Sequence, residues 1–169
     1  MNGGQKLKFL CFLLGDRVFA LEIMGIREIL RLQPVTPIPD APSTVIGIIN
    51  VRGELLPVMD MRKLFAVSGE EAVKREMRIV VGGRAGSRFG MMVDSVLEVV
   101  TLSVDEIEPA PTDEADGPVL GIFKRPGDED GKIVILLKTG AVGRFARGER
   151  KGAKGAESGP EGQDKPPEF

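Results

Sequence analysis

The stretch VIGIINVRGELLPVMD, residues 45–60, contains two short apolar runs that meet at Arg52-Gly53. Runs rich in Val and Ile that are separated by a tight two-residue turn are typical of a β-hairpin. The stretch therefore predicts two antiparallel strands, and the rest of the chain can be compared with this pattern.

Similar runs occur on both sides of this hairpin. Residues 7–14 form an apolar run that ends at Gly15-Asp16. Later examples cover residues 18–23, 77–81, 89–93, 96–102, 119–123 and 133–137, while residues 61–65 suit one or two helical turns. Gly47, Gly90 and Gly121 lie inside such runs and predict bends or bulges. Together these runs predict an all-β fold.

Extended stretches divide the strands into groups. Residues 34–42, PVTPIPDAP, are too rich in proline for a helix or a central strand, and a second extended stretch covers residues 103–117. Residues 66–76 predict an internal seam. Two successive groups of strands, each with such an excursion, predict two small barrels within residues 7–145. Because a barrel of about 60 residues is marginally stable alone, we expect the two to share buried surface.

The C-terminal stretch, residues 146–169, differs from the rest in composition. It contains no β-branched residue, and its one aromatic residue is Phe169. Its basic and acidic side chains are equal in number. A stretch of this kind cannot bury enough apolar surface to offset the loss of chain entropy, so we expect a disordered tail.

The side chains present exclude most kinds of catalytic site. The chain of 169 residues has no His and a single Cys, Cys11, which lies in an apolar run that predicts a buried, unreactive thiol. Without His there is no imidazole base and no His metal ligand, and one thiol supports neither an intrachain disulfide nor a thiolate zinc site. We therefore expect no enzyme activity, no metal and no cofactor.

Three further patterns favour ordinary structure. Residues 82–86 lack the order of a phosphate-binding loop, and residues 128–130 lack the twelve-residue calcium pattern. The net charge of −2 predicts no general electrostatic attraction to nucleic acid. The apolar run at residues 9–14 is far shorter than the ~20 residues that cross a bilayer, and no signal-peptide pattern precedes it. We expect a cytoplasmic protein that does not insert into membranes.

Two surface features fit partner binding. Arg52 lies at a tight turn between apolar strands, where either any polar residue suffices or a guanidinium is held out toward a partner carboxylate or carbonyl. Sequence spacing leaves both interpretations open. Residues 26–29, IREI, alternate apolar and charged side chains, so one apolar side chain is expected to face outward beside an arginine.

Several motifs in order resemble one family. These are FLCFLLGD at residues 9–16, IREI at 26–29, TPIP at 36–39, GIINVRG at 47–53, PVMD at 57–60 and VDSV at 93–96. They look like the CheW family, the coupling protein of bacterial chemotaxis, over about residues 8–137. The N-V-R-G and P-V-M-D block followed by V-D-S-V at this distance is the specific part of the resemblance.

The resemblance implies two intertwined five-stranded SH3-like β-barrels with a hydrophobic groove between them, and no catalysis. It implies an adaptor between the cytoplasmic tips of methyl-accepting chemotaxis receptors and the regulatory domain of a CheA-type histidine kinase. The positions where the family meets the receptor are Ile26, Glu28, Arg52, Val93, Asp94 and Val96. The family's kinase contacts lie on the ends of both barrels and are not assigned to residues here.

This chain departs from the family near its C-terminal end. Where the family has an I-L-D motif and a C-terminal helix, this chain reads ILLKTG at residues 135–140, and Gly140, Gly143 and Gly148 disfavour a long helix.

Three alternative functions remain open. The protein could be an antagonist that occupies one partner without bridging, a paralogue serving another chemosensory output, or a small-barrel nucleic-acid-binding protein.

Overall fold

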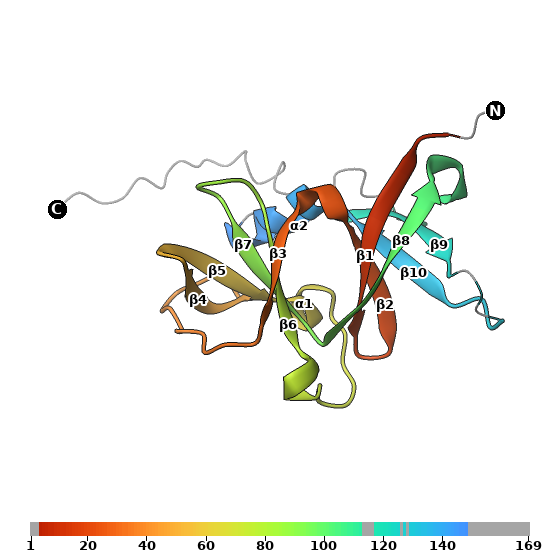
Figure 1. Ribbon diagram of the computed structural model, residues 1–169. Coiled ribbons are helices and arrows are strands. Elements are labelled where there is room, and N and C mark those ends of the chain that lie inside the picture. The colour runs from red at the N-terminus through yellow and green to blue at the C-terminus, as the bar shows by residue number, and fades with distance from the viewer. Residues whose placement is uncertain (1–3, 113–116, 126, 128, 149–169) are drawn as a thin grey trace.

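The computed structural model describes residues 4–112, 117–125, 127 and 129–148, and these residues form two five-stranded sheets that lie side by side (Figure 1). Barrel A has the strand order β8-β1-β2-β10-β9, and barrel B has the order β3-β6-β7-β5-β4. The predicted all-β fold of two intertwined five-stranded SH3-like barrels is confirmed.

The strands of barrel A are β1 (Lys6–Leu14), β2 (Arg17–Glu22), β8 (Ser95–Ser103), β9 (Val119–Lys124) and β10 (Ile133–Leu137). Those of barrel B are β3 (Ile26–Arg31), β4 (Val45–Val51), β5 (Glu54–Asp60), β6 (Arg78–Gly82) and β7 (Phe89–Val93). The short helices are η1 (Ile23–Gly25), α1 (Met61–Leu64), η2 (Lys74–Glu76), η3 (Val104–Glu106) and α2 (Thr139–Ala146).

The predicted seam at residues 66–76 does not divide the two barrels. Strand β5 before it and strand β6 after it belong to the same sheet. The chain instead passes from barrel A to barrel B between β2 and β3, and returns between β7 and β8. The division into successive halves is therefore wrong, because the apolar pattern reports which faces are buried and not which strands pair.

Strand β1 is apolar on both faces because each face belongs to a different core. Phe9 and Cys11 point into a cluster formed by the strands of barrel A. Leu10, Phe12 and Leu14 belong to a second cluster, the shared core, which includes Met59 and other residues of barrel B. A third cluster fills barrel B. Alternate side chains of a strand point to opposite faces, so one strand serves its own barrel and the joint between barrels.

Two of the three glycines inside strands allow a close approach of backbone. Thr36 forms an isolated β-bridge with Ile48, the residue after Gly47. A Cβ at Gly47 would collide with the backbone carbonyl of Thr36. A Cβ at Gly121 would lie 2.6 Å from the carbonyl oxygen of Glu108. The register shifts next to both glycines, as the predicted bulges require, whereas Gly90 lies in regular pairing. The extended stretches thus dock on corresponding strands of the two barrels.

Helix α2 forms despite its glycines and packs on the shared core. Val142 is fully buried, and Gly143 lacks a Cβ where the ring of Phe89 lies. Ala146, which the sequence analysis placed in the tail, is buried at the end of this helix. The rest of the predicted disordered tail, from residue 149 onward, lies outside the described residues. In the described part of the chain, no helix is long and apolar enough to span a bilayer.

Candidate functional site

The β4–β5 turn holds Arg52 in an unusual backbone conformation. Arg52 and Gly53 have φ angles of 51° and 87°, and the turn is closed by pairing of Val51 with Glu54. The side chain of Asn50 accepts a 2.8 Å hydrogen bond from the amide of Gly53. The left-handed conformation favours Gly, which lacks a Cβ, and Asn, whose short side chain hydrogen-bonds locally, so either would suit the turn better than Arg. An arginine here is not explained by the turn alone.

Arg52 and Glu28 form a bidentate ion pair. Nη1 of Arg52 lies 2.7 Å from Oε2 of Glu28, and Nη2 lies 2.9 Å from Oε1. Glu28 lies on edge strand β3 and Arg52 follows edge strand β4, so the pair joins the two edges of barrel B. The Arg52 side chain is 74% exposed and that of Glu28 is 20% exposed.

The ion pair changes the acidity of Glu28. Hydrogen bonds from Arg52 lower the pKa of Glu28 below its ordinary value of 4.5, against the effect of desolvation, and the charges of Arg52 and Arg88 lower it further. Glu28 is therefore a carboxylate at neutral pH. The bidentate pair, here called the fork, places charged groups with a fixed orientation at the surface, so a partner must match both their charge and their geometry.

Strand β3 places its side chains alternately on two sides. The register shifts between Ile26 and Glu28, and Arg27 Nε donates to the carbonyl of Gly83 over 2.8 Å. Ile26 is partly buried against the shared core, whereas Ile29 is 43% exposed. The expectation of one outward apolar side chain in this segment is confirmed, and that side chain is Ile29.

The remaining predicted residues lie where the chain returns from barrel B to barrel A: Val93 ends β7, Asp94 follows it, and Val96 lies on β8. Ile26 pairs with Gly82, which is opposite Phe89, whereas Val93 pairs with Arg78 at the far end of the same strands. Val93 is fully buried in the shared core and has no surface to offer a partner, so its placement among contact residues is corrected. Val96 is partly buried against the same core.

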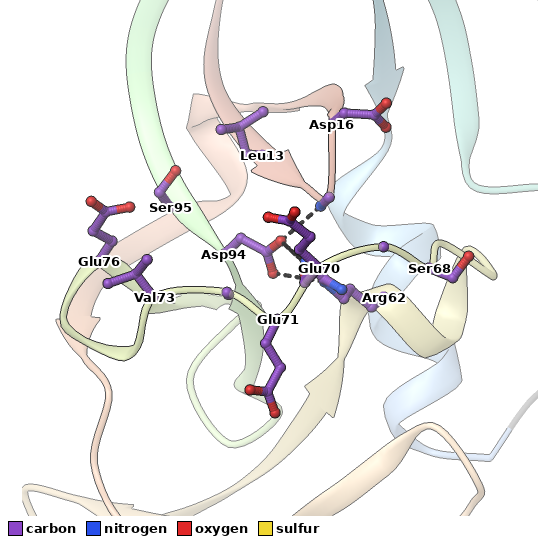
Figure 2. Close-up of a pocket in the computed structure, with 13 residues that line it drawn as sticks. Leu13, Asp16, Arg62, Ser68, Glu70, Glu71, Val73, Glu76, Asp94 and Ser95 are labelled. Carbon is purple, nitrogen blue, oxygen red and sulfur yellow. Dashed lines mark hydrogen bonds and ion pairs between the residues drawn. The ribbon is translucent and has the colours of Figure 1, made fainter.

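Asp94 is bound by its own chain (Figure 2). Its carboxylate accepts a 2.7 Å hydrogen bond from the amide of Gly15 and bonds of 2.6 to 3.1 Å from Nη2 and Nε of Arg62. The side chains of Arg62 and Asp94 are 21% and 12% exposed. Hence the structure brings Glu28 and Arg52 together, with Ile26 two residues away, and separates them from Val93, Asp94 and Val96.

Sequence reasoning missed residues beside the ion pair. Leu55, three residues after Arg52, is 61% exposed. Arg88 contacts Glu54 over 3.4 Å, and both border a hollow of about 220 Å³ with Leu55 and Phe89. Adjacent residues of a strand point to opposite faces, so the sequence places Leu55 and Leu56 on different faces of β5, and the structure shows that Leu55 is the exposed one.

Reactive groups are scarce in the part of the chain that the structure describes. There, no group of three or more His, Cys, Asp or Glu side chains could hold a metal ion. Burial raises the pKa of Cys11 to about 11, the charge of Glu98 contributes, and that of Arg125 opposes it. Cys11 is fully buried, so the prediction of a buried core thiol is confirmed.

Fold and surface together define a class: a double-barrel β protein whose exposed hairpin carries an arginine–carboxylate fork and the exposed side chain of Leu55. Arginine beside apolar side chains is typical of protein-binding surfaces.

A family model, the CheW-like domain, matches residues 8–145, so the chain belongs to the CheW-like domain family. A chemotaxis protein CheW of Rhizobium meliloti is 36% identical over 157 residues, which cover 90% of this chain and 94% of that protein. The protein FrzA of Myxococcus xanthus is 32% identical over 146 residues, or 83% of this chain and 91% of FrzA. The crystal structure of the scaffolding protein TtCheW from Thermoanaerobacter tengcongensis is similar with a TM-score of 0.68 and 32% identity, covering 79% of this chain and 90% of that chain.

Proposed function

We propose that this protein is a non-enzymatic cytoplasmic adaptor that couples methyl-accepting chemoreceptors to a CheA-type histidine kinase. The observation that carries the proposal is the Glu28–Arg52 fork, held on a left-handed turn at the edge of barrel B. Membership of the CheW-like domain family and the chemotaxis names of the relatives support it.

The fork suits the side of a receptor helix. Although two of its nitrogens bind Glu28, the Arg52 side chain is 74% exposed. A carboxylate or carbonyl of a partner can therefore reach the guanidinium from solvent. Leu55, three residues after Arg52 on the same hairpin, supplies exposed apolar surface, whereas Ile29 faces the other side of β3 from Glu28. An amphipathic receptor helix offers both kinds of group on one face, as helices that dock in grooves do. We assign Ile26, Glu28 and Arg52 to the receptor-binding surface.

The second surface belongs to the kinase and is not assigned to residues. An ion pair between Glu98 and Arg125, 3.3 Å long, joins the edge strands of barrel A as the Glu28–Arg52 pair joins those of barrel B. The shared core makes the two barrels one packed unit. Binding at one barrel can therefore influence binding at the other, and such coupling is reciprocal in free energy.

A reconstitution experiment tests this function. The full chain is mixed with receptor cytoplasmic fragments and a CheA-type kinase, and the kinase activity and the composition of the complex are measured with and without it. An adaptor yields a ternary complex and receptor-dependent kinase activity. Formation of binary complexes alone indicates an antagonist and overturns the coupling role, and so does the absence of any complex.

A further inference from the structure

We infer that Asp94 is a positioning residue: with Arg62 it forms a polar clip that sets the orientation of barrel A relative to barrel B. The clip consists of Asp94, Arg62 and the amide of Gly15. The inference rests on the proposed function only for its consequence in signalling, because the geometry itself concerns this chain alone.

Asp94 lies where the chain returns from one barrel to the other. It is the single residue between β7 of barrel B and β8 of barrel A. Its amide donates a 3.0 Å hydrogen bond to the carbonyl of Leu13 on β1. A change in the angle between the barrels must therefore rotate the backbone at this residue.

The carboxylate of Asp94 joins groups from both barrels. The amide of Gly15, 2.7 Å away, belongs to the β1–β2 turn of barrel A. Arg62, which donates through Nε and Nη2, belongs to α1 directly after β5 of barrel B. With these bonds made and only 12% of the side chain exposed, the carboxylate has little capacity left for a partner protein.

Arg62 extends the clip to the connection between β5 and β6. Its Nη2 also donates to the carbonyl of Glu70 over 2.7 Å. Earlier in this connection, Val67 packs so closely on the β1–β2 turn that a Cβ at Gly15 would lie 3.0 Å from its side chain. Arg62, Glu70 and Asp94 line an open cleft (Figure 2), which has a volume of about 420 Å³. The connection of barrel B is thereby fixed against the turn of barrel A.

The shared core and the clip restrain the barrels in different ways. The hydrophobic effect that holds the shared core together is non-directional, and its fit depends on packed shapes alone. A guanidinium–carboxylate pair and an amide hydrogen bond depend on direction and distance. The shared core therefore holds the barrels together, and the clip selects one angle between them.

The other crossing between barrels is held sterically. A Cβ at Gly25 would lie 2.7 Å from Cβ of Thr139, and the amide of Gly83 donates to the carbonyl of Gly25 over 3.3 Å. This contact involves no ion pair. When the clip is broken, we expect the barrels to pivot about this tight crossing, with the largest displacement near Asp94.

The consequence concerns the proposed receptor surface on barrel B. The orientation of this receptor surface relative to barrel A depends on the angle between the two barrels, which the clip selects. A protein without the clip should still bind a receptor fragment through Arg52, yet transmit the receptor's state to the kinase poorly. A contact residue has the opposite signature, because its loss lowers receptor affinity directly.

The test measures the angle and the binding separately. Spin labels are attached at Thr101→Cys on barrel A and Arg84→Cys on barrel B, both exposed positions, while Cys11 is buried and stays unlabelled. Distance distributions between the labels are compared for the otherwise unchanged chain, Asp94→Asn, Arg62→Lys and the matched control Asp16→Asn, an exposed carboxylate on the same cleft. Receptor-fragment affinity and kinase activation are measured on unlabelled versions of the same variants.

The expected result is a shifted or broadened distribution for Asp94→Asn, a smaller change for Arg62→Lys, and none for Asp16→Asn. Receptor affinity should change by less than about threefold while kinase activation falls. Unchanged distributions in both clip variants overturn the inference, as does a loss of receptor affinity of about tenfold or more with an unchanged distribution. Should Asp94→Asn fail to fold, Arg62→Lys alone decides. The distance measurement needs no partner, so failure of the proposed function leaves its outcome intact.

Discussion

Two arginine–carboxylate pairs with similar bond lengths lie at opposite ends of barrel B. The Glu28–Arg52 pair has contacts of 2.7 and 2.9 Å and an arginine that is 74% exposed. The Arg62–Asp94 pair has a shortest contact of 2.6 Å, and its arginine is 21% exposed. Asp94 and Arg62 also bind Gly15 and Glu70, whereas no further bond of Glu28 or Arg52 to the described residues supports the first pair.

The difference lies in what surrounds each pair. An exposed pair is screened by water and contributes little to folding, so its groups are available to another protein. A partly buried pair with further hydrogen bonds is costly to break, because the group left behind has lost part of its hydration and several partners. Hence the same chemistry can serve recognition at one end of the barrel and internal positioning at the other.

The largest expected effect comes from removing the carboxylate of the Arg62–Asp94 pair. Asp94→Ala should lower the free energy of unfolding by about 2 kcal/mol, since the amide of Gly15 and the guanidinium of Arg62 lose their acceptor. Glu28→Ala, its counterpart in the exposed pair, should leave unfolding almost unchanged. Urea denaturation followed by circular dichroism measures both. Equal losses of stability in the two variants would remove the distinction between the pairs.

Reversing the charge of the exposed pair should act on binding instead. Arg52→Glu places two carboxylates side by side at the proposed receptor surface, and we expect receptor-fragment affinity to fall about tenfold. The circular dichroism spectrum should stay native, and titration calorimetry gives the affinity. Arg17→Glu, the same change at an exposed position of barrel A, is the matched control. A native Arg52→Glu variant with unchanged affinity would falsify this assignment.

Local patterns predicted most strands because most strands bury at least one face, whereas β3, which has no fully buried residue, was not predicted as a strand. The doubly apolar run at residues 7–14 even indicated that both faces of β1 are buried. The pairing of strands was not visible in these patterns. Parallel pairs such as β2 with β10 and β5 with β7 join segments far apart in the chain, so the strands were grouped by sequence order and the seam was misplaced.

The candidate site was predicted less completely than the fold. The turn drew attention to Arg52, and the resemblance added Glu28, but their pairing joins strands at opposite edges of a sheet. The motif VDSV led to the prediction that Val93 and Asp94 contact the receptor, as Arg52 was predicted to do. A family motif marks positions without saying whether a side chain meets a partner or packs internally, and burial separates the two: Val93 is fully buried.

A third change tests whether the side chain of Arg52 serves binding at a cost to the stability of the turn. Arg52→Gly relieves the left-handed backbone, which glycine adopts freely, and removes the ion pair. We expect a small rise in the thermal unfolding midpoint together with weaker receptor binding. Differential scanning calorimetry measures the midpoint, and Arg17→Gly, at a residue without a positive φ angle, serves as the control. A lower midpoint for Arg52→Gly would mean that the exposed pair contributes to folding after all.

The smallest effect is the titration of Glu28. Its pKa lies below the ordinary 4.5 in the folded protein because Arg52 hydrogen-bonds the ionised form. A carboxyl whose pKa is lowered by folding contributes stability that is present above its unfolded pKa and is lost as the pH falls through the folded value. Carboxyl-carbon NMR should therefore give a midpoint below 4.5, and Arg52→Gln should move it upward. Receptor affinity should then stay constant between about pH 8 and pH 6, where the carboxylate remains ionised. A midpoint at or above 4.5 in the unmodified protein would show that the fork does not hold in solution, and the contrast between the two pairs would then rest on Asp94 alone.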